Sequence, residues 1–286
     1  MRSRIMTTTN RKFSVKPSPS TYAFFLVAPA IQSLFAGAIF AQQPAPAAAR
    51  RTPVVVELFT SEGCSSCPPA DALLAKLESQ QPFPNIEVLA LEEHVDYWNN
   101  GGWTDPFSSD SLTLRQYVYA SAIAQGNSYT PQMVVDGHDE LIGSRAQQAV
   151  DTIERAATRK KADVSVVGSE PRPNGEQLLH IQVVTLPNPA AHDTPEVWLA
   201  ITETGLHSDV KRGENAGEDL HHAAVVRKLR KIGVASASGP RSYSSDQTLK
   251  LDPAWKRENV RFVVFVQERK SKQIVAAGSA PFPATP

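Results

Sequence analysis

A Cys-x-x-Cys motif at residues 64–67 constrains this chain more than any other feature, because Cys64 and Cys67 are the only cysteines among 286 residues. An apolar, β-branched run at 54–59 precedes the motif and predicts a buried strand. Residues 67–80 follow with apolar side chains at helical spacing and predict a helix. A strand that becomes a helix through two closely spaced cysteines is the layout of a redox-active site.

The predicted helix gives the two cysteines different roles. A thiolate is the reactive form of cysteine, and an unperturbed thiol has a pKa of about 8.5. Cys64 lies just before the helix, where unpaired backbone N–H groups stabilise negative charge, so we expect it to be the exposed nucleophile. Cys67, one helical turn further along, is the expected resolving thiol that releases a bound partner.

Residues 54–161 predict one α/β domain. Two strands joined by a helix come first, followed by an aromatic-rich loop and a second helix. Asp136-Gly137 then predicts a hairpin between two further strands, and a last helix closes the domain. The resulting order, β-α-β-α-β-β-α, is typical of a thioredoxin-like fold. The predicted strands are 54–59, 86–91, 132–135 and 140–142, and the predicted helices are 67–80, 111–125 and 144–160.

Residues 162–286 change to short strands separated by Pro, Gly, Asn and Asp. Their alternating apolar pattern predicts an all-β second domain, a sandwich of immunoglobulin-like type. The predicted strands are 163–167, 178–186, 197–204, 223–229, 248–251, 260–267 and 274–280.

The N-terminal residues predict export. A basic region is followed by an almost wholly apolar stretch at 22–40 and by small residues, which is typical of a signal peptide over 1–41. A Pro- and Ala-rich linker follows at 42–53. We therefore expect a periplasmic or secreted protein with no membrane association, unless the apolar stretch remains as an uncleaved membrane anchor.

The charge balance argues against nucleic acid as a partner. Residues 1–41 hold five basic residues and no acidic one, so the remainder has 24 basic and 29 acidic residues, a net charge of −5. Binding to a phosphate backbone needs a basic face, and the remainder has no basic patch with interleaved aromatic residues.

Tyr129-Thr130-Pro131 immediately precedes the third predicted strand of the α/β domain. In thioredoxin-like folds this position holds a cis-proline that packs against the cysteine pair, and the residue before it offers main-chain hydrogen bonds to an extended substrate. We therefore expect Pro131 to be cis and Thr130 to shape a substrate groove. Glu57, seven residues before Cys64, is a candidate acceptor for the proton of Cys67 if it is buried nearby; a solvent-facing strand glutamate is the alternative.

Several segments resemble a bacterial and plant domain-of-unknown-function family, numbered 1223, of the thioredoxin-like superfamily. The resemblance implies a thioredoxin-like fold and export, and it spans about residues 53–280. It implies no substrate. The segments that carry it are Glu-Leu-Phe-Thr-Ser-Glu-Gly-Cys-Ser-Ser-Cys-Pro-Pro-Ala-Asp at 57–71, His-Val-Asp-Tyr-Trp at 94–98, Gly-Trp-Thr-Asp-Pro-Phe at 102–107, Tyr-Thr-Pro-Gln at 129–132, Gly-Glu-Asn at 213–215, Leu220 and Val-Val-Arg at 225–227.

The loop at 93–109 and its surroundings supply candidate substrate-binding residues. A histidine after the second strand lies at the same strand end as the cysteines and could lower a thiol pKa or shuttle protons. The aromatic residues could form a substrate surface, or they could simply cover the sheet. The candidates are His94, Tyr97, Trp98, Trp103 and Tyr129.

The sequence leaves three hypotheses for the cysteine pair. The first is thiol–disulfide exchange with protein thiols or disulfides, or with a redox partner protein, and it needs no cofactor. The second is a non-catalytic binding protein with a structural disulfide. The third is copper handling by the two thiolates with His94, since copper(I) accepts few ligands and favours thiolate. A zinc site is not predicted, because tetrahedral zinc wants four ligands and the chain has one cysteine pair. His221 and His222 precede a predicted strand, and we do not expect them to bind a metal or a ligand.

Overall fold

The first strands of the computed structural model form the part of the sheet that carries the cysteine motif. β1 (Thr52–Thr60) is parallel to β2 (Ile86–His94) and antiparallel to β3 (Gln132–Val135), which pairs with β4 (Asp139–Ile142). Thr60 and His94 are paired, so the carboxyl ends of β1 and β2 meet at one edge. The predicted order of strands and helices in this half is confirmed.

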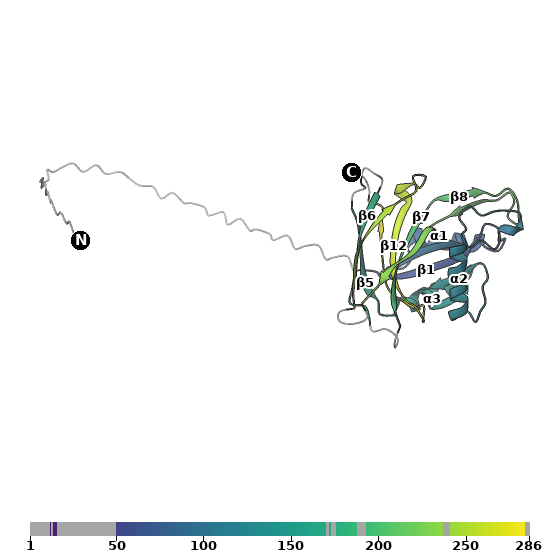
Figure 1. Cartoon of the computed structure of the whole chain (residues 1–286), viewed down its shortest axis with the longest axis horizontal. Coiled ribbons are helices and arrows are strands. Elements are labelled where there is room, and N and C mark those ends of the chain that lie inside the picture. The colour runs from purple at the N-terminus through teal and green to yellow at the C-terminus, as the bar shows by residue number, and fades with distance from the viewer. Residues whose placement is uncertain are drawn as a thin grey trace, which may run out of the picture. The chain divides into compact units, whose positions relative to one another are not determined.

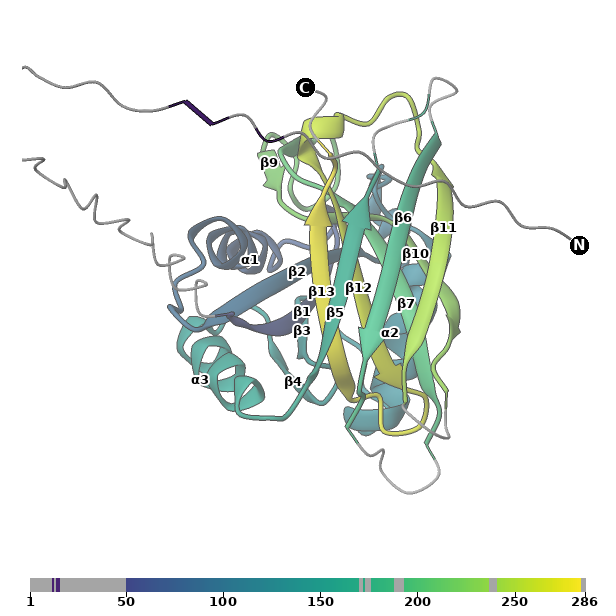
Figure 2. The same cartoon turned by 90° about the vertical axis from the view of Figure 1, so that its left-hand side faces the viewer.

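Three helices cover the two faces of these strands (Figure 1). α1 (Pro68–Gln80) and α3 (Ala146–Ala157) pack on the face that carries alternate apolar residues of β1 such as Val56, while α2 (Asp110–Ile123) packs on the opposite face. Alternate residues of a strand point to opposite sides, which is why the nearly continuous apolar run of β1 can bury both faces. In Figure 2, α1 and α3 lie close to β1 and β2 at the left, whereas α2 lies apart from these two helices, behind the strands of the second half.

The start and end of α1 follow from local chemistry. Pro68 and Pro69 occupy its first turn, where the missing N–H groups have no helical partner to lose. Gln81 ends the helix in the left-handed conformation, with φ of 43°. Cys67 is therefore the residue immediately before the first helical position.

The second half contains all seven strands that the sequence predicts there. They are β5 (Ala162–Gly168), β6 (Glu176–Val184), β7 (Pro195–Glu203), β10 (Val225–Val234), β11 (Tyr243–Lys250), β12 (Val260–Glu268) and β13 (Ile274–Pro281).

The predicted separate immunoglobulin-like sandwich is wrong, because these strands continue the sheet of the first half. β10 pairs with β2 in parallel, with Val225 opposite Glu92. One sheet therefore contains the strands of both halves, in the order β11-β6-β5-β13-β12-β7-β10-β2-β1-β3-β4. An alternating apolar pattern predicts that a strand exists and which of its faces is buried, but it does not predict with which strand it pairs. The protein is thus a mixed α/β fold with one 11-stranded sheet, and residues 46–286 form one compact unit. The domain division near residue 161 stays a prediction.

The strands of the second half curl around a core of their own. The Tyr243 hydroxyl donates to the carbonyl of Ile232 at 2.9 Å, and Arg230 donates to Gln247 at 3.0 Å. These bonds bring β11 beside β10, although five strands lie between β11 and β10 in the sheet order. Apolar side chains of β5, β6, β7, β11 and β12 fill the space inside the curl.

The sequence does not predict the short hairpin that lies between β7 and β10. β8 (Leu206–Asp209) and β9 (Asp219–His222) form a two-stranded sheet, and β9 contacts α1. Short 3-10 helices lie at Asn99–Gly101 and Arg257–Asn259.

The structure describes residues 12, 14–15, 50–169, 172, 176–187, 193–236 and 241–283. The predicted signal peptide at 1–41 and most of the linker at 42–53 lie outside these residues, apart from isolated positions, and β1 already begins at Thr52. In the described part of the chain, no helix is long and apolar enough to span a membrane.

Candidate functional site

Cys64 and Cys67 form a disulfide at the N-terminus of α1, so the predicted position of the motif between β1 and the helix is confirmed. Ser65 and Ser66, between them, are exposed. Both cysteines are completely buried, with 0% exposure. The predicted exposure of Cys64 is therefore wrong for the disulfide-bonded structure, whereas its role as the nucleophile stays a prediction.

The loop 210–218 between β8 and β9, which we call the cover loop, binds the backbone around Cys64. The Glu214 carboxylate accepts hydrogen bonds from the backbone N–H and the hydroxyl of Ser65, at 3.1 and 2.7 Å. The Asn215 side-chain amide donates to the carbonyls of Glu62 and Cys64, at 2.8 and 3.1 Å. A loop about 150 residues further along the chain thus holds the backbone of the motif on both sides of Cys64.

Gly213 explains how the cover loop can approach so closely. Its φ of +83° is left-handed, a conformation that residues with a side chain rarely adopt. A Cβ at this position would lie 3.2 Å from the Cβ of Trp103, so the loop backbone is nearly in contact with the aromatic loop.

The Thr130–Pro131 peptide bond is cis, which confirms that part of the prediction. Pro131 lies near α1, since a Cβ on Gly143 would meet both Ala70 and Pro131, at 3.2 and 3.3 Å. The Trp98 indole N–H donates to the Thr130 hydroxyl at 2.8 Å.

Trp98 also reaches the residue before the first cysteine. A Cβ on Gly63 would lie 3.0 Å from the Trp98 Cβ. Trp98 therefore connects the Cys-x-x-Cys turn to the cis-proline turn, and the structure brings these two sequence-predicted elements together.

The other aromatic candidates use their polar atoms inside the protein. Trp103 donates to the Glu62 carboxylate at 2.7 Å, and the Tyr97 hydroxyl donates to Gln116 at 3.1 Å. The Tyr129 hydroxyl donates to Glu140, and burial together with this carboxylate raises the tyrosine pKa. All three aromatic rings are half-buried, and their role in substrate binding stays a prediction.

Glu57 lies on the α2 side of β1, where its carboxylate binds residues of α2. Arg115 and Tyr119 each bind it at 2.5 Å. Glu93 lies beside the same arginine, 3.4 Å from its Nε, and burial followed by the charge of Glu57 raises the Glu93 pKa well above its usual value. The proposed transfer of a proton from Cys67 to Glu57 therefore has no supporting contact in the described part of the chain, and it stays a prediction.

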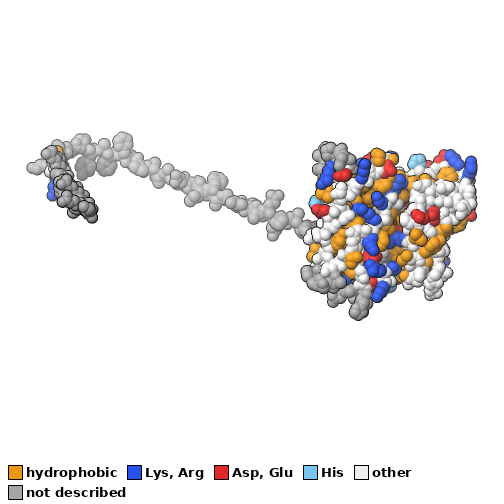
Figure 3. Space-filling model, viewed as in Figure 1, with side chains coloured by type: hydrophobic (Ala, Val, Ile, Leu, Met, Phe, Trp, Pro, Cys, Tyr) orange, Lys and Arg blue, Asp and Glu red, His pale blue; other side chains and the backbone are white. Residues whose placement is uncertain are grey.

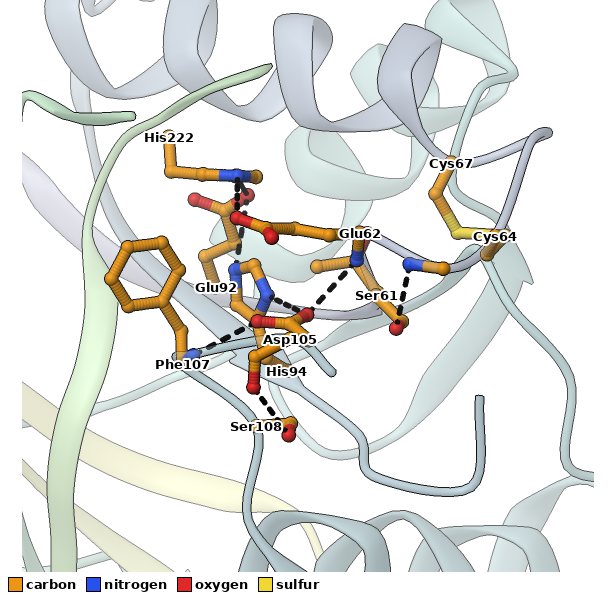
Figure 4. A network of polar contacts seen from close by, with 12 residues as sticks. Ser61, Glu62, Cys64, Cys67, Glu92, His94, Asp105, Phe107, Ser108 and His222 are labelled. Carbon is orange, nitrogen blue, oxygen red and sulfur yellow. Dashed lines mark hydrogen bonds and ion pairs between the residues drawn. A yellow bond between two sulfur atoms is a disulfide. The ribbon is translucent and has the colours of Figure 1, made fainter. Parts of the chain in front are cut away.

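His94 belongs to a buried polar network that runs from β2 to the cysteine turn (Figure 4). Its Nδ1 lies 2.7 Å from the Asp105 carboxylate, which also accepts the backbone N–H of Glu62 at 2.9 Å. His222, at the end of β9, lies with Nδ1 2.9 Å from Glu92 and with Nε2 3.2 Å from Glu62. Glu62 thus connects both histidines to the segment that leads into Cys64.

Burial and carboxylates act in opposite directions on the pKa values of this network. Burial alone would lower the pKa of His94, but the Asp105 carboxylate raises it well above its usual value. For His222 burial is likewise opposed by hydrogen bonds to Glu62 and Glu92, and the pKa is about 9. Asp71, one turn after Cys67, has a pKa of about 7, because burial and the charge of Glu92 disfavour its ionised form.

Sequence reasoning missed most of this network. Glu62, Asp105 and Asn215 lie in segments that resemble the family, but the sequence assigns them no role, and it predicts no role for Glu92 or His222. One signal was present in the spacing of Glu92 and His94, because residues two apart on a strand point to the same side. The contribution of β9 had no comparable local signal.

A cavity of about 460 Å³ lies elsewhere, between α2 and strands β7, β10 and β12. Its lining includes Leu114, Arg115, Trp198 and Lys231, and it includes neither cysteine. Figure 3 shows basic and hydrophobic side chains side by side over the strands of the second half. The cavity is therefore separate from the cysteine site.

Comparison with known proteins assigns the chain to a family. The family model described as "Protein of unknown function (DUF1223)" matches residues 55–267, which is well over half of the sequence. The chain belongs to the DUF1223 family. The predicted family resemblance is thereby confirmed over both halves of the sheet.

Two solved structures resemble this DUF1223 protein over most of its length. Protein AGR_C_4864 from Agrobacterium tumefaciens is 27% identical, with a TM-score of 0.61 over 83% of this chain and 97% of that chain. HBP35 of Porphyromonas gingivalis is 14% identical, with a TM-score of 0.61 over 83% of this chain and 81% of that chain, which indicates a shared fold alone. No curated protein matches the sequence.

Proposed function

We propose that this protein is an exported, thioredoxin-like thiol–disulfide oxidoreductase that acts on protein thiols or disulfides in the periplasm or outside the cell. The observation that carries the proposal is the Cys64–Cys67 disulfide at the N-terminus of α1, with the cis-proline turn at Pro131 connected to it through Trp98. This arrangement places a breakable bond at a helix end that favours thiolate.

The exchange can be written for the disulfide form of the site. A thiolate of the partner protein attacks Cys64 Sγ, the Cys64–Cys67 bond breaks, and Cys67 leaves as a thiolate near the N-terminus of α1. A second partner thiolate then attacks the partner sulfur of the mixed disulfide and releases Cys64. The partner gains a disulfide and loses two electrons and two protons, and the two cysteines gain them. The reverse sequence reduces a partner disulfide.

Access to Cys64 requires movement of the cover loop, because both cysteines are buried in the closed conformation. Glu214 and Asn215 hold the motif only by hydrogen bonds, and most residues of their loop are exposed. Exposed loops with few apolar contacts open locally at low free-energy cost. Once the cover loop opens, Thr130, Pro131 and Trp98 would border the exposed cysteine turn and receive an extended segment of the partner.

The proposal is tested with the full chain in two assays, reduction of insulin disulfides and refolding of a scrambled disulfide protein. The Cys64→Ser variant is the matched control, because it removes the attacking sulfur and leaves the rest of the site. We expect activity from the wild type in at least one assay and none from the variant. Equal rates for both proteins in both assays would overturn the proposal.

One observation favours a second candidate function, a binding protein whose disulfide is structural. Cys64 and Cys67 have 0% exposure, as is typical of cysteines that do not react. The reduction potential of the pair separates the candidates, since structural disulfides lie below about −300 mV and catalytic ones lie higher. A potential in the higher range, measured against glutathione, supports exchange.

A further inference from the structure

Three buried side chains behind the cysteine turn have the chemistry of metal ligands. Glu92 and His94 point to the same side of β2, and His222 approaches them from the end of β9 (Figure 4). One ligand atom from each of the three lies within 4.8 Å of the others, and all three residues are buried. Two ligands held at ~2.0–2.2 Å from one ion lie about 3–4 Å apart, so small side-chain rotations suffice for joint binding.

The Nε2 atom of His94 faces Glu92 and His222 and has no hydrogen-bond partner among the described residues. The Nδ1 atom of the same ring is taken by the Asp105 carboxylate at 2.7 Å, and Nε2 is completely buried. A carboxylate oxygen of Glu92 lies 3.7 Å from this Nε2, which is too far for a hydrogen bond. Buried polar atoms without a partner are rare and unfavourable, and a bound ion would satisfy this one.

Each histidine is backed by a carboxylate on the nitrogen that faces away from the group. Asp105 binds Nδ1 of His94, and Glu62 lies 3.2 Å from Nε2 of His222. Metal-binding histidines in proteins characteristically have such a carboxylate, which fixes the ring and makes the ligating nitrogen more basic. The nitrogen of His222 that faces the group is Nδ1, 2.9 Å from the Glu92 carboxylate.

Charge favours a cation at this point. Glu62, Glu92 and Asp105 bring three carboxylates into one buried volume. Phe107 packs against the rings of His94 and His222, with ring centroids 5.5 and 5.6 Å apart, and shields the group from water. Buried carboxylates need a compensating positive charge, which either two protonated imidazoles or a divalent ion bound to two neutral imidazoles supplies.

We propose that Glu92, His94 and His222 bind a divalent first-row transition-metal ion. Zn²⁺ serves as the test ion in the experiment below. Two imidazole nitrogens and one carboxylate oxygen suit such ions, whereas Mg²⁺ and Ca²⁺ prefer sites made of oxygen atoms alone. The site uses no sulfur, since both cysteines are joined in the disulfide, so it differs from a thiolate copper site. The ion would join β2 to β9 and so hold the hairpin that carries the cover loop.

The test is calorimetric titration of Zn²⁺ into the metal-stripped full chain, both as the oxidised wild type and as the Cys64→Ala/Cys67→Ala variant. We expect one Zn²⁺ per chain in both proteins. Replacement of a ligand in His222→Ala should weaken binding by about 100-fold or more, and Asp105→Asn by about 10–100-fold. The matched control is His221→Ala, because His221 is the exposed neighbour on the same strand, and its Zn²⁺ affinity should stay unchanged.

A second measurement needs no variant and keeps the proposal falsifiable if His222→Ala does not fold. Co²⁺ bound to the oxidised wild type should give visible d–d bands without a sulfur-to-metal charge-transfer band. Absence of stoichiometric binding, a sulfur charge-transfer band, or equal Zn²⁺ affinity in a folded His222→Ala chain would overturn the proposal. Because the cysteine-free variant cannot exchange disulfides, metal binding and exchange activity succeed or fail independently.

Discussion

The side-chain amide of Asn215 donates a hydrogen bond to the backbone carbonyl of Cys64, 151 positions earlier in the chain, at 3.1 Å. The same amide donates to the carbonyl of Glu62 at 2.8 Å, so one buried side chain holds the turn that leads into the disulfide. The hairpin between β7 and β10 is thereby fastened to the turn that holds the cysteines.

Asn215→Ala should make the Cys64–Cys67 disulfide react faster with dithiothreitol. The two lost hydrogen bonds contribute about 1–3 kcal/mol together, and their loss should raise the population with an open cover loop by about 5- to 150-fold. Stopped-flow or quenched reduction of the full chain measures the rate. Glu218→Ala is the control, because Glu218 is an exposed residue of the same loop. Equal rates for wild type and Asn215→Ala would show that the loop does not limit access.

Cys67→Ser should accumulate a mixed disulfide between Cys64 and a partner protein. Without the second thiol, the intermediate formed when Cys64 attacks a disulfide is not resolved. Incubation of the reduced variant with insulin, followed by a non-reducing gel, detects the adduct. Cys64→Ser is the matched control and should give little adduct, and the assignment of the two roles is reversed if it gives more.

The individual strands could be predicted from the sequence because their signals are local. The predicted strand at 260–267 is observed as β12 over Val260–Glu268, where buried residues such as Phe262 and Val264 alternate on the core side. Strand partners are not local. The pairing of Val225 with Glu92 joins segments more than a hundred residues apart, and no pattern within either segment specifies it.

The candidate site divides in the same way. Cys64, Cys67 and Pro131 could be recognised because their chemistry is visible in a few adjacent residues. Asn215 and His222 lie on a hairpin whose four-residue strands are mostly polar, so they carry almost no strand signal. Their contacts with Glu62 span 153 and 160 positions, a separation at which only the folded chain brings residues together.

Gly63→Ala should destabilise the protein through Trp98. The added methyl group would lie 3.0 Å from the Trp98 Cβ and 3.2 Å from its carbonyl oxygen, both of which are fixed by the backbone. Overpacking of this kind costs about 1–3 kcal/mol. The free energy of unfolding in urea measures the effect. Gly101→Ala is the control, since a Cβ there meets nothing within 4 Å, and an equally large loss at Gly101 would contradict the explanation.

Arg115→Met should destabilise the protein more than a surface substitution, because Arg115 forms a buried ion pair with Glu57. Its Nε lies 2.5 Å from Glu57 and 3.4 Å from Glu93, and its side chain is only 9% exposed. Methionine is an unbranched apolar side chain that can lie against the rings of Tyr119 and Trp198, but it removes the positive charge beside Glu57. Removal of one partner of a buried ion pair costs about 3–5 kcal/mol.

Arg159→Met provides the matched control for this prediction. Arg159 pairs with Asp139 nearer the surface, where the two side chains are 22% and 25% exposed. Solvent screens this pair, so its loss should cost no more than about 1 kcal/mol. Urea unfolding of both variants at neutral pH measures the difference. Similar losses for the two arginines would contradict the explanation, because the buried pair of Arg115 would then matter no more to stability than the solvent-screened pair of Arg159.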